Sequence, residues 1–287
     1  MQILVVSPRV APGLLTLSAW DAMRAAATVR ATDLDDPHVE AIVTAGIAVD
    51  ATPAVPSYEA DAVWIAPTGD VGWAQQIATD LVDGTREGGH VEIIFGSYDQ
   101  PGARLLDLVE VMDQLRTQCP WTKEQTHASL SHYLLEEAYE TLESLDSGNS
   151  EHLLEELGDL LMQVVFHARI AAEAEGWDID SVAEGIVAKL IYRNPHVFGD
   201  EVVTSADEVD AQWQRLKKVE KARASPLDGI PVEMPALAFA DKVLGRIGDV
   251  AVSGNDFGSR LLALVQQARA EGVNAEEALR KSVRSLF

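Results

Sequence analysis

The strongest constraint on the fold comes from two adjacent stretches, 126–145 and 151–174, whose apolar residues recur every three or four positions. That spacing matches the turn of an α-helix, so each stretch would present one continuous apolar face. Gly148 separates the two stretches, and a glycine at such a place favours the end of a helix. The sequence therefore predicts two long antiparallel helices joined by a short turn, as in a helical bundle.

The segments on either side of this helical region differ from it in composition. Residues 1–103 contain no lysine and alternate short β-branched runs with helical stretches, a pattern typical of a small α/β sheet. Pro101-Gly102 and Ser225-Pro226 interrupt the chain near the two changes in composition. We therefore expect a mainly α protein with three parts: a small α/β domain (1–103), a helical bundle (104–223) and a helical tail (224–287).

The expected elements are short in the first part and long in the second. The predicted strands are Gln2–Val6, Ala62–Ile65 and Val91–Phe95, and the predicted helices beside them are Leu15–Ala27, Val39–Ala45 and Val71–Val82. The predicted bundle helices are Leu105–Arg116, Thr126–Leu145, Glu151–Ala174, Ile179–Arg193 and Ala206–Arg223.

Composition excludes several classes of function. The formal net charge of −24 over 287 residues disfavours binding of a nucleic-acid polymer through a general basic surface. No run of about 18 apolar residues is present, and no basic region precedes the first apolar run, so we expect neither a membrane span nor an export signal. Cys119 is the single cysteine, which excludes an internal disulfide and fits a reducing cytoplasm.

Carboxylates are paired on both central helices. Glu137 and Glu140 lie three positions apart on the first, and Glu156 and Asp159 three apart on the second, so the members of each pair are separated by 60° around their helix. Each pair could point into one space between the helices, where a cation would have to neutralise it. The other interpretation is an acidic solvated face.

Two features favour the cation site over the solvated face. Asp159 is closely surrounded by apolar residues, and Gly158, in mid-helix, indicates either a close backbone approach or a bulky ligand nearby. A di-iron bundle would need Glu-x-x-His on two helices, and neither helix has it. Ligands that offer only oxygen suit Mg²⁺, which commonly keeps coordination positions for water and substrate phosphates.

Basic and aromatic residues that could bind phosphate and a base follow on the next helices. Lys189 and Arg193 are four positions apart on one predicted helix, and Trp213 precedes Lys217 on the next. Taken singly, each basic pair is more typical of an ordinary surface pair and the tryptophan of a core residue. Their combination with the carboxylates is what favours a phosphate-binding site.

These residues also form an ordered set of motifs. Leu134-Leu-Glu-Glu-Ala-Tyr-Glu140, then Glu156-Leu-Gly-Asp159, resembles the E-E-x-x-E…E-x-x-D signature of MazG nucleoside triphosphate pyrophosphohydrolases. Cys119-Pro-Trp-Thr-Lys-Glu-Gln-Thr-His127 and Asn194-Pro-His-Val-Phe198 resemble the same family. The resemblance covers about residues 104–223. It implies an all-α bundle that dimerises and hydrolyses nucleoside triphosphates to nucleoside monophosphate and pyrophosphate with Mg²⁺.

The resemblance also implies a role for each matching residue. Glu137, Glu140, Glu156 and Asp159 would ligate the metal, and Glu136 would orient the attacking water. Lys189 and Arg193 would hold the phosphates, and Trp213 and Lys217 would complete the nucleotide site. The alternatives are a narrower dNTP or modified-nucleotide pyrophosphatase of the same superfamily, and an acidic helical interaction module without catalysis.

The two flanking segments carry weaker resemblances. Residues 257–269 repeat the pattern of 157–169, but Ser259 stands where the first copy has Asp159. The tail is therefore expected to be a degenerate second MazG repeat without the metal site. Ile3-Leu-Val-Val6, Leu14-Leu-Thr-Leu17 and Gly96-Ser-Tyr-Asp99 give residues 1–103 a resemblance to a shortened tetrapyrrole-methylase-like domain. The glycine-rich cofactor loop of that domain is absent, so we expect no methyl transfer.

Overall fold

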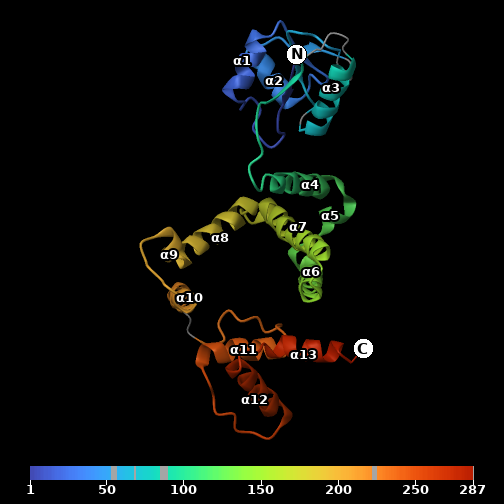
Figure 1. Cartoon of the computed structure of the whole chain (residues 1–287). Helices are drawn as coiled ribbons and strands as arrows, with labels where there is room; N and C mark the ends of the chain where they lie inside the picture. Colours follow the sequence, from blue (N-terminus) through green and yellow to red (C-terminus); the bar gives the residue numbers. More distant parts are fainter. Residues whose placement is uncertain (53–56, 68, 85–89, 222–224, 287) are drawn as a thin grey trace. The chain divides into compact units, whose positions relative to one another are not determined.

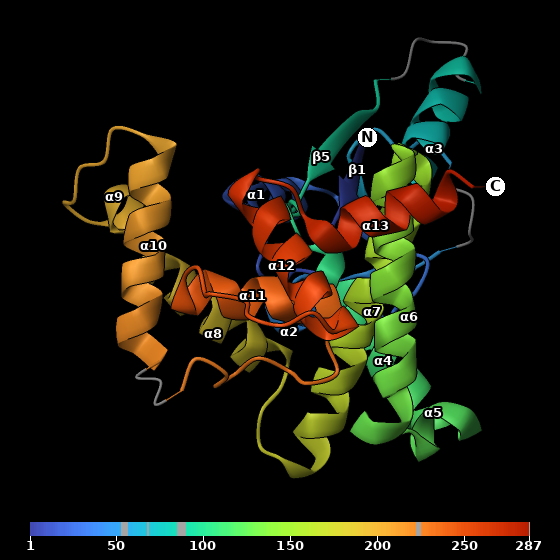
Figure 2. The same cartoon turned by 90° about the horizontal axis from the view of Figure 1, so that it is seen from below.

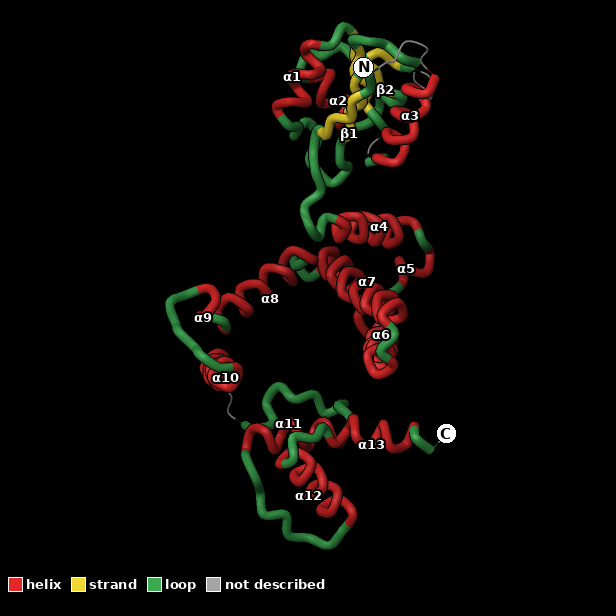
Figure 3. The backbone as a smooth tube through the Cα atoms, viewed as in Figure 1, coloured by secondary structure: helices red, strands yellow, loops and turns green. Residues whose placement is uncertain are grey.

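The computed structural model describes residues 1–52, 57–67, 69–84, 90–221 and 225–286. The chain divides into two compact units, Met1–Val182 and Ala183–Phe287. Within the described ranges all strands lie in the first hundred residues, and the remainder is helical (Figure 3). The mainly α fold with a small α/β domain at its start is thus confirmed. The boundaries at 103 and 223 differ from this two-unit division and stay predictions.

The first part of the chain forms a five-stranded sheet with the order β3-β2-β4-β1-β5. All pairings between the described strands are parallel, and β1 and β5 lie side by side in Figure 2. The strands are β1 (Gln2–Val5), β2 (Thr28–Ala31), β3 (Asp50–Ala51), β4 (Ala62–Ile65) and β5 (Glu92–Phe95). The three strands predicted from the sequence are present. The predictions missed β2 and β3, which are too short or too polar to give a strand pattern.

Three helices cover this sheet: α1 (Leu17–Ala25), α2 (Pro37–Thr44) and α3 (Val71–Gly84). Alternate residues of β1 face opposite sides, and each side has its own core. Leu4 packs with residues of α1 and α2, whereas Ile3 packs with residues of α3. Figure 1 shows α1 and α2 on one side of this part of the chain and α3 on the other. Helices on both faces are what an all-parallel sheet requires, because both of its faces must be buried.

The helices that follow agree closely with the periodicity of the sequence. They are α4 (Arg104–Gln118), α5 (Pro120–Glu124), α6 (His127–Ser147), α7 (Ser150–Ala174), α8 (Ile179–Arg193), α9 (Pro195–Phe198) and α10 (Ala206–Lys221). The predicted end of the last one, at Arg223, lies outside the described residues. Thr126 forms a capping box at the start of α6, Gly148 (φ 68°) ends it, and Asn149 caps α7. These three residues fix the tight turn between α6 and α7.

The tail contains α11 (Ala236–Ile247), α12 (Phe257–Ala270) and α13 (Ala275–Arg284), and α11 packs against the other two. A helical tail was predicted; its origin as a second repeat stays a prediction. None of the helices in the described part of the chain has the length and apolar character needed to cross a membrane.

The α6–α7 hairpin is stabilised by α4, which packs across it. Met112 of α4, Leu130 of α6, and Val165 and Phe166 of α7 form one buried apolar cluster. Burial of such side chains contributes about 1.5–3 kcal/mol each. This cluster fixes α6 and α7 against a third helix, so the hairpin does not depend on its connecting turn alone.

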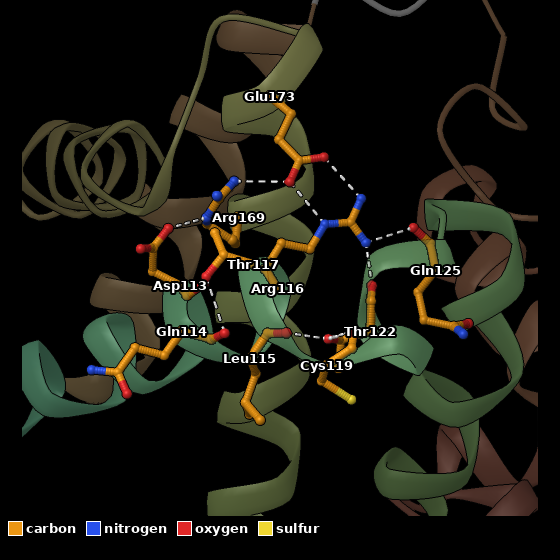
Figure 4. A network of polar contacts seen from close by, with 10 residues as sticks. All are labelled: Asp113, Gln114, Leu115, Arg116, Thr117, Cys119, Thr122, Gln125, Arg169 and Glu173. Atoms are coloured by element: carbon orange, nitrogen blue, oxygen red, sulfur yellow. Dashed lines mark hydrogen bonds and ion pairs between the residues drawn. The ribbon is translucent and has the colours of Figure 1, made fainter.

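A polar network around Arg116 joins the same elements (Figure 4). Arg116 is 9% exposed, and its Nε and Nη2 each donate to one carboxylate oxygen of Glu173 at 2.8 Å. Its Nη1 donates to the backbone carbonyls of Thr122 and Gln125. Arg169 also donates to Glu173, at 3.0 Å. One guanidinium therefore ties α4, the α5 turn and the end of α7 together.

Replacing Arg116 with alanine should lower the free energy of unfolding by about 2–4 kcal/mol, because it removes two hydrogen bonds to Glu173 and one to each of two backbone carbonyls. Urea unfolding followed by circular dichroism measures this change. Arg104→Ala is the matched control: Arg104 is on the same helix, 79% exposed, and pairs with Asp107 at the surface, so its loss should cost less than about 0.5 kcal/mol. Equal effects of the two variants would contradict the structural role of the network.

Candidate metal centre

Three carboxylates converge between α6 and α7. Glu137 of α6 and Glu156 and Asp159 of α7 each offer an oxygen, and these oxygens lie within 4.8 Å of one another. Among the described residues they are the one group of three or more acidic, histidine or cysteine side chains close enough to share an ion. The structure thus brings together three of the four carboxylates in the two predicted pairs, and Glu140 is not in the group.

Small polar residues let the two helices approach at this point. Thr141 and Ser144 of α6 are buried, at 7% and 0% exposure. The Thr141 hydroxyl donates to the carbonyl of Glu137 at 2.8 Å within α6, and lies 3.4 Å from the carbonyl of Glu156 on α7. A larger side chain at either position would separate the helices and, with them, the carboxylates.

The most buried member of the cluster is Glu156, at 7% exposure. Its Oε1 lies 2.8 Å from Nε2 of His152, one turn earlier on the same helix. Its Oε2 is buried and has no hydrogen-bond partner among the described residues. A buried carboxylate oxygen without a donor is costly. A cation at this position would remove that cost, so the residues present fit a metal ion.

The electrostatic surroundings of Glu137 also favour a metal ion at this position. Burial raises the pKa of its carboxyl, and Asp159, Glu140, Glu156 and Glu136 raise it further, in that order of effect. Mutual repulsion of this kind is relieved when a divalent ion replaces the proton. Glu140 and Glu136 are exposed. They act on Glu137 through charge but do not belong to the group of three.

One expectation about this region is corrected by the structure. A Cβ built on Gly158 would meet no atom within 4 Å, so a close approach of the described backbone is not the reason for glycine in mid-helix. The other expectation, a bulky ligand nearby, stays a prediction. The chemistry of the cluster is that of a hard-cation site, since its ligands are all carboxylate oxygens.

The predicted phosphate and nucleotide residues lie in the second unit, on α8 and α10. Lys189 is exposed and Lys217 is half-buried. Arg193 is 6% exposed, and its guanidinium lies 5.1 Å from the centre of the Trp213 ring. The structure thus brings Arg193 and Trp213 together, as a cation–π pair. The roles of these residues toward substrate stay predictions.

Sequence reasoning missed two partners of the candidate site residues. Nε and Nη2 of Arg193 both donate to Oε2 of Glu220, at 2.9 and 2.7 Å. Glu220 is 27 residues away in the chain, and no local spacing connects it to Arg193. His152, by contrast, is four positions before Glu156, and the spacing of neighbours on one helix face could have identified it.

Comparisons with known proteins agree with this geometry. A family model, described as the MazG nucleotide pyrophosphohydrolase domain, matches residues 125–198, which include α6 and α7. The chain is 35% identical over 216 residues to a protein of Thermotoga maritima named nucleoside triphosphate pyrophosphohydrolase/pyrophosphatase MazG, covering 64% of this chain and 83% of that protein.

Two further relatives extend the comparison. An uncharacterised 26.1 kDa protein from the blaB 3′ region of Streptomyces cacaoi is 44% identical over 221 residues, or 74% of this chain and 91% of that protein. A nucleoside triphosphate pyrophosphohydrolase of Mycolicibacterium smegmatis is 47% identical over 180 residues, or 61% of this chain; the match spans 55% of that relative's length. The predicted resemblance to MazG is confirmed, whereas the methylase-like interpretation of residues 1–103 stays a prediction.

Replacing Glu137 with glutamine should distinguish the effect of carboxylate repulsion on the melting temperature from the effect of metal binding. A carboxyl whose pKa is raised above its ordinary value of 4.5 binds more protons in the folded state than in the unfolded state. Its contribution to the free energy of unfolding therefore falls as the pH rises from the unfolded-state pKa through the higher folded-state pKa. In metal-free buffer at pH 7, E137Q should therefore melt a few degrees above the wild type.

Added Mg²⁺ should raise the melting temperature of the wild type but raise that of E137Q much less, because a ligand is missing. Differential scanning calorimetry with and without Mg²⁺ checks both expectations. Glu143→Gln, at an exposed position of α6, is the control and should behave as the wild type. A metal-free E137Q that melts below the wild type would contradict the crowding of carboxylates.

Proposed function

This chain belongs to the MazG family of nucleotide pyrophosphohydrolases, and from that premise we propose that it is a Mg²⁺-dependent enzyme that hydrolyses nucleoside triphosphates to nucleoside monophosphate and pyrophosphate. The observation that carries the proposal is the convergence of Glu137, Glu156 and Asp159 between α6 and α7. Three carboxylates around a space for a hard cation are typical of sites in which an ion contacts both protein and phosphate.

Mg²⁺ would be held by Glu137, Glu140, Glu156 and Asp159, where it would supply charge neutralisation for the triphosphate and lower the pKa of a bound water. Glu137, Glu156 and Asp159 form the convergent part of this set. Glu140 is exposed and follows Glu137 by one turn, so it is accessible to an ion that sits at the outer side of the cluster.

The remaining site residues would bind and orient the reactants. Glu136, exposed beside Glu137, would accept a hydrogen bond from the attacking water and align it with the α-phosphorus. The oxygen of that water would form a bond to the α-phosphorus as the bond to the oxygen that bridges to the β-phosphate breaks. One proton of the water would pass to Glu136, and pyrophosphate would leave. Helices α6 and α7 serve as rigid supports, which is what precise alignment of water and phosphorus requires.

Lys189 and Arg193 would bind the phosphate oxygens, and Trp213 with Lys217 would bind the nucleoside. Support comes from the contact of Arg193 with Trp213, which places a cation beside an aromatic face suited to a base. Arg193 is also bound to Glu220. A phosphate at Arg193 would therefore have to share the guanidinium with that carboxylate or displace it.

We further propose that the enzyme acts as a homodimer in the cytoplasm. Large apolar side chains of the α6–α7 hairpin are exposed, among them Leu135 at 56%, Leu154 at 76% and Leu157 at 48%. Exposed apolar side chains of this kind favour burial against a second copy. The single free cysteine, Cys119, fits a reducing compartment.

Product analysis tests the proposal directly. With Mg²⁺ the chain should release equal amounts of nucleoside monophosphate and pyrophosphate from nucleoside triphosphates, and a chelator should abolish the reaction. Glu156→Gln should lower kcat/KM by at least about 10³-fold, because it removes a buried metal ligand. Glu155→Gln, the exposed neighbour on the same helix, should leave the rate within about twofold.

The pattern of products separates the alternatives. Release confined to dNTPs or to oxidised nucleotides in a substrate panel would support the narrower pyrophosphatase. Orthophosphate as the sole product, or full activity in E156Q, would reject the proposed reaction. No turnover, together with no Mg²⁺-dependent thermal shift in the presence of a non-hydrolysable triphosphate, would support an interaction module.

Replacing Lys189 with alanine should raise KM for the triphosphate by about tenfold, or about 1.4 kcal/mol, with a smaller effect on kcat, if its charge binds phosphate in the ground state. Steady-state kinetics at two ionic strengths measure this change, since salt weakens the contribution of an exposed cation. Lys123→Ala, also at an exposed position, is the control. An unchanged KM in K189A would exclude Lys189 from phosphate binding.

A further inference from the structure

Two histidines meet at the end of the α6–α7 hairpin that is opposite to its connecting turn. Nδ1 of His127, at the start of α6, lies 2.7 Å from Nδ1 of His167 on α7, and the two ring planes are within 4° of parallel. A nitrogen–nitrogen contact this short is a hydrogen bond, so one proton lies between the rings. None of the steps proposed above uses this pair.

The outer face of His127 contacts the end of α7. Its Nε2 is buried and lies 3.1 Å from Oε1 of Glu175, close enough for an ion pair when the ring is protonated, although the angle is not that of a hydrogen bond. Glu175 is the residue that ends α7. The Trp177 ring lies nearly parallel to His127, with centres 6.2 Å apart. His127 therefore bridges the beginning of α6, the middle of α7 and the turn that follows α7.

The inner face of the pair is buried. Nε2 of His167 has no hydrogen-bond partner among the described residues, and neither has Oε1 of Gln163, one turn earlier on α7. Burial lowers the pKa of the His167 imidazole, and the neighbouring charge of His127 lowers it further. The pair can therefore carry one excess proton, facing Glu175, but a second would place two cations in contact.

Among the described residues, no carboxylate other than that of Glu175 forms an ion pair with either histidine. Glu173, on α7, is bound by Arg116 of α4 and Arg169 of α7, and Arg169 is also bound to Asp113 of α4. Glu175 is the carboxylate in contact with His127. The positive charge of a second proton on the pair would therefore have no further carboxylate beside it among the described residues.

We propose that His127 and His167 form a proton-sharing clasp that holds the open end of the α6–α7 hairpin and thereby positions Glu137 of α6 against Glu156 and Asp159 of α7. The three carboxylates lie between this clasp and the turn at Gly148: Glu137 is ten residues after His127, and Asp159 is eight before His167. At 1.5 Å per residue these separations are about 15 and 12 Å along the helices. Both histidines are positioning residues and touch neither metal nor substrate.

The clasp should become less stable as the pH falls. As pH falls, the second proton enters more readily when the rings are apart than when they are in contact, so acid favours the open hairpin. Opening separates the carboxylates and weakens Mg²⁺ binding. This loss adds to the loss caused by protonation of the carboxylates themselves, so the acid limb of metal binding becomes steeper than one proton would make it.

The test compares His127→Gln and His167→Gln with His132→Gln, an exposed histidine of the same helix. Mg²⁺ affinity is measured by calorimetry between about pH 5 and 8, a range that brackets the ordinary histidine pKa of about 6.5. The acid limb of log affinity should have a slope near two in the wild type and H132Q, and near one in both clasp variants. Both variants should also bind Mg²⁺ about tenfold more weakly at pH 7.5. Equal slopes in all four proteins would overturn the proposal.

Nuclear magnetic resonance provides a readout that does not involve the metal. In H127Q the His167 ring should titrate at higher pH than in the wild type, because a neighbouring cation is removed; a purely structural His127 would leave that titration unchanged and overturn the proposal. If H127Q does not fold, Glu175→Gln at its exposed position serves instead. It should move the acid limb to higher pH, because the closed clasp then holds its excess proton less tightly than in the wild type. An unmoved limb would contradict the clasp.

The clasp rests on the proposed function only for its link to catalysis. There, the slope of the acid limb of log kcat/KM against pH should fall in both clasp variants by the same amount as the slope for Mg²⁺ affinity. Absence of pyrophosphate release would reject the function while the calorimetric and magnetic-resonance results still decide the clasp. Normal turnover with an acid limb unaltered in both variants would reject the clasp and leave the function intact.

Discussion

The candidate site depends on one constraint, which is that helix packing holds three negatively charged side chains close together. Packing of α6 against α7 brings Glu137, Glu156 and Asp159 within 4.8 Å of one another, and the most buried of them keeps one oxygen without a donor. Apart from the contact of His152 with one oxygen of Glu156, no described residue compensates the repulsion or the desolvation of the cluster, so other contacts must hold the helices together. A divalent cation would reverse the sign of this interaction, converting a destabilising cluster into a cross-link between the two helices.

Helix α7 carries most of what holds the cluster in place. Near its start it supplies Glu156 and Asp159, in its second half His167, and near its end Glu173 and Glu175. Contacts to α4 through Arg116 and to α6 through His127 lie on the far side of the carboxylates from the turn at Gly148. The hairpin is thus fixed at both ends. This arrangement allows ligands on two separate helices to keep one geometry.

Much of the bundle and of the metal cluster could be predicted from sequence because both depend on local periodicity. Apolar spacing gives α6 and α7, Gly148 marks their turn, and three-residue spacing places each carboxylate pair on one face. Contacts between side chains that are far apart in the sequence could not be predicted from local periodicity. The pairing of Arg193 with Glu220 and the contact of His127 with His167 both arise from packing.

The short elements of the sheet were also beyond prediction. The edge strand β3 has two residues, and β2 has four, including Arg30, so neither gives a period long enough to recognise. Glu140 shows a finer limit: its spacing from Glu137 is that of a ligand, yet it lies outside the group of three, so its role as a ligand stays a prediction. Side-chain direction at the edge of an interface is decided by contacts that spacing does not encode.

The most direct test is a crystal structure with Mn²⁺ and a triphosphate analogue that cannot be cleaved between its α- and β-phosphates, with the metal located by anomalous scattering. The account predicts metal density between α6 and α7, at about 2.0–2.2 Å from oxygens of Glu137, Glu156 and Asp159, in contact with the phosphates. Metal bound by the phosphates alone, with these three side chains directed away from it, would contradict the account.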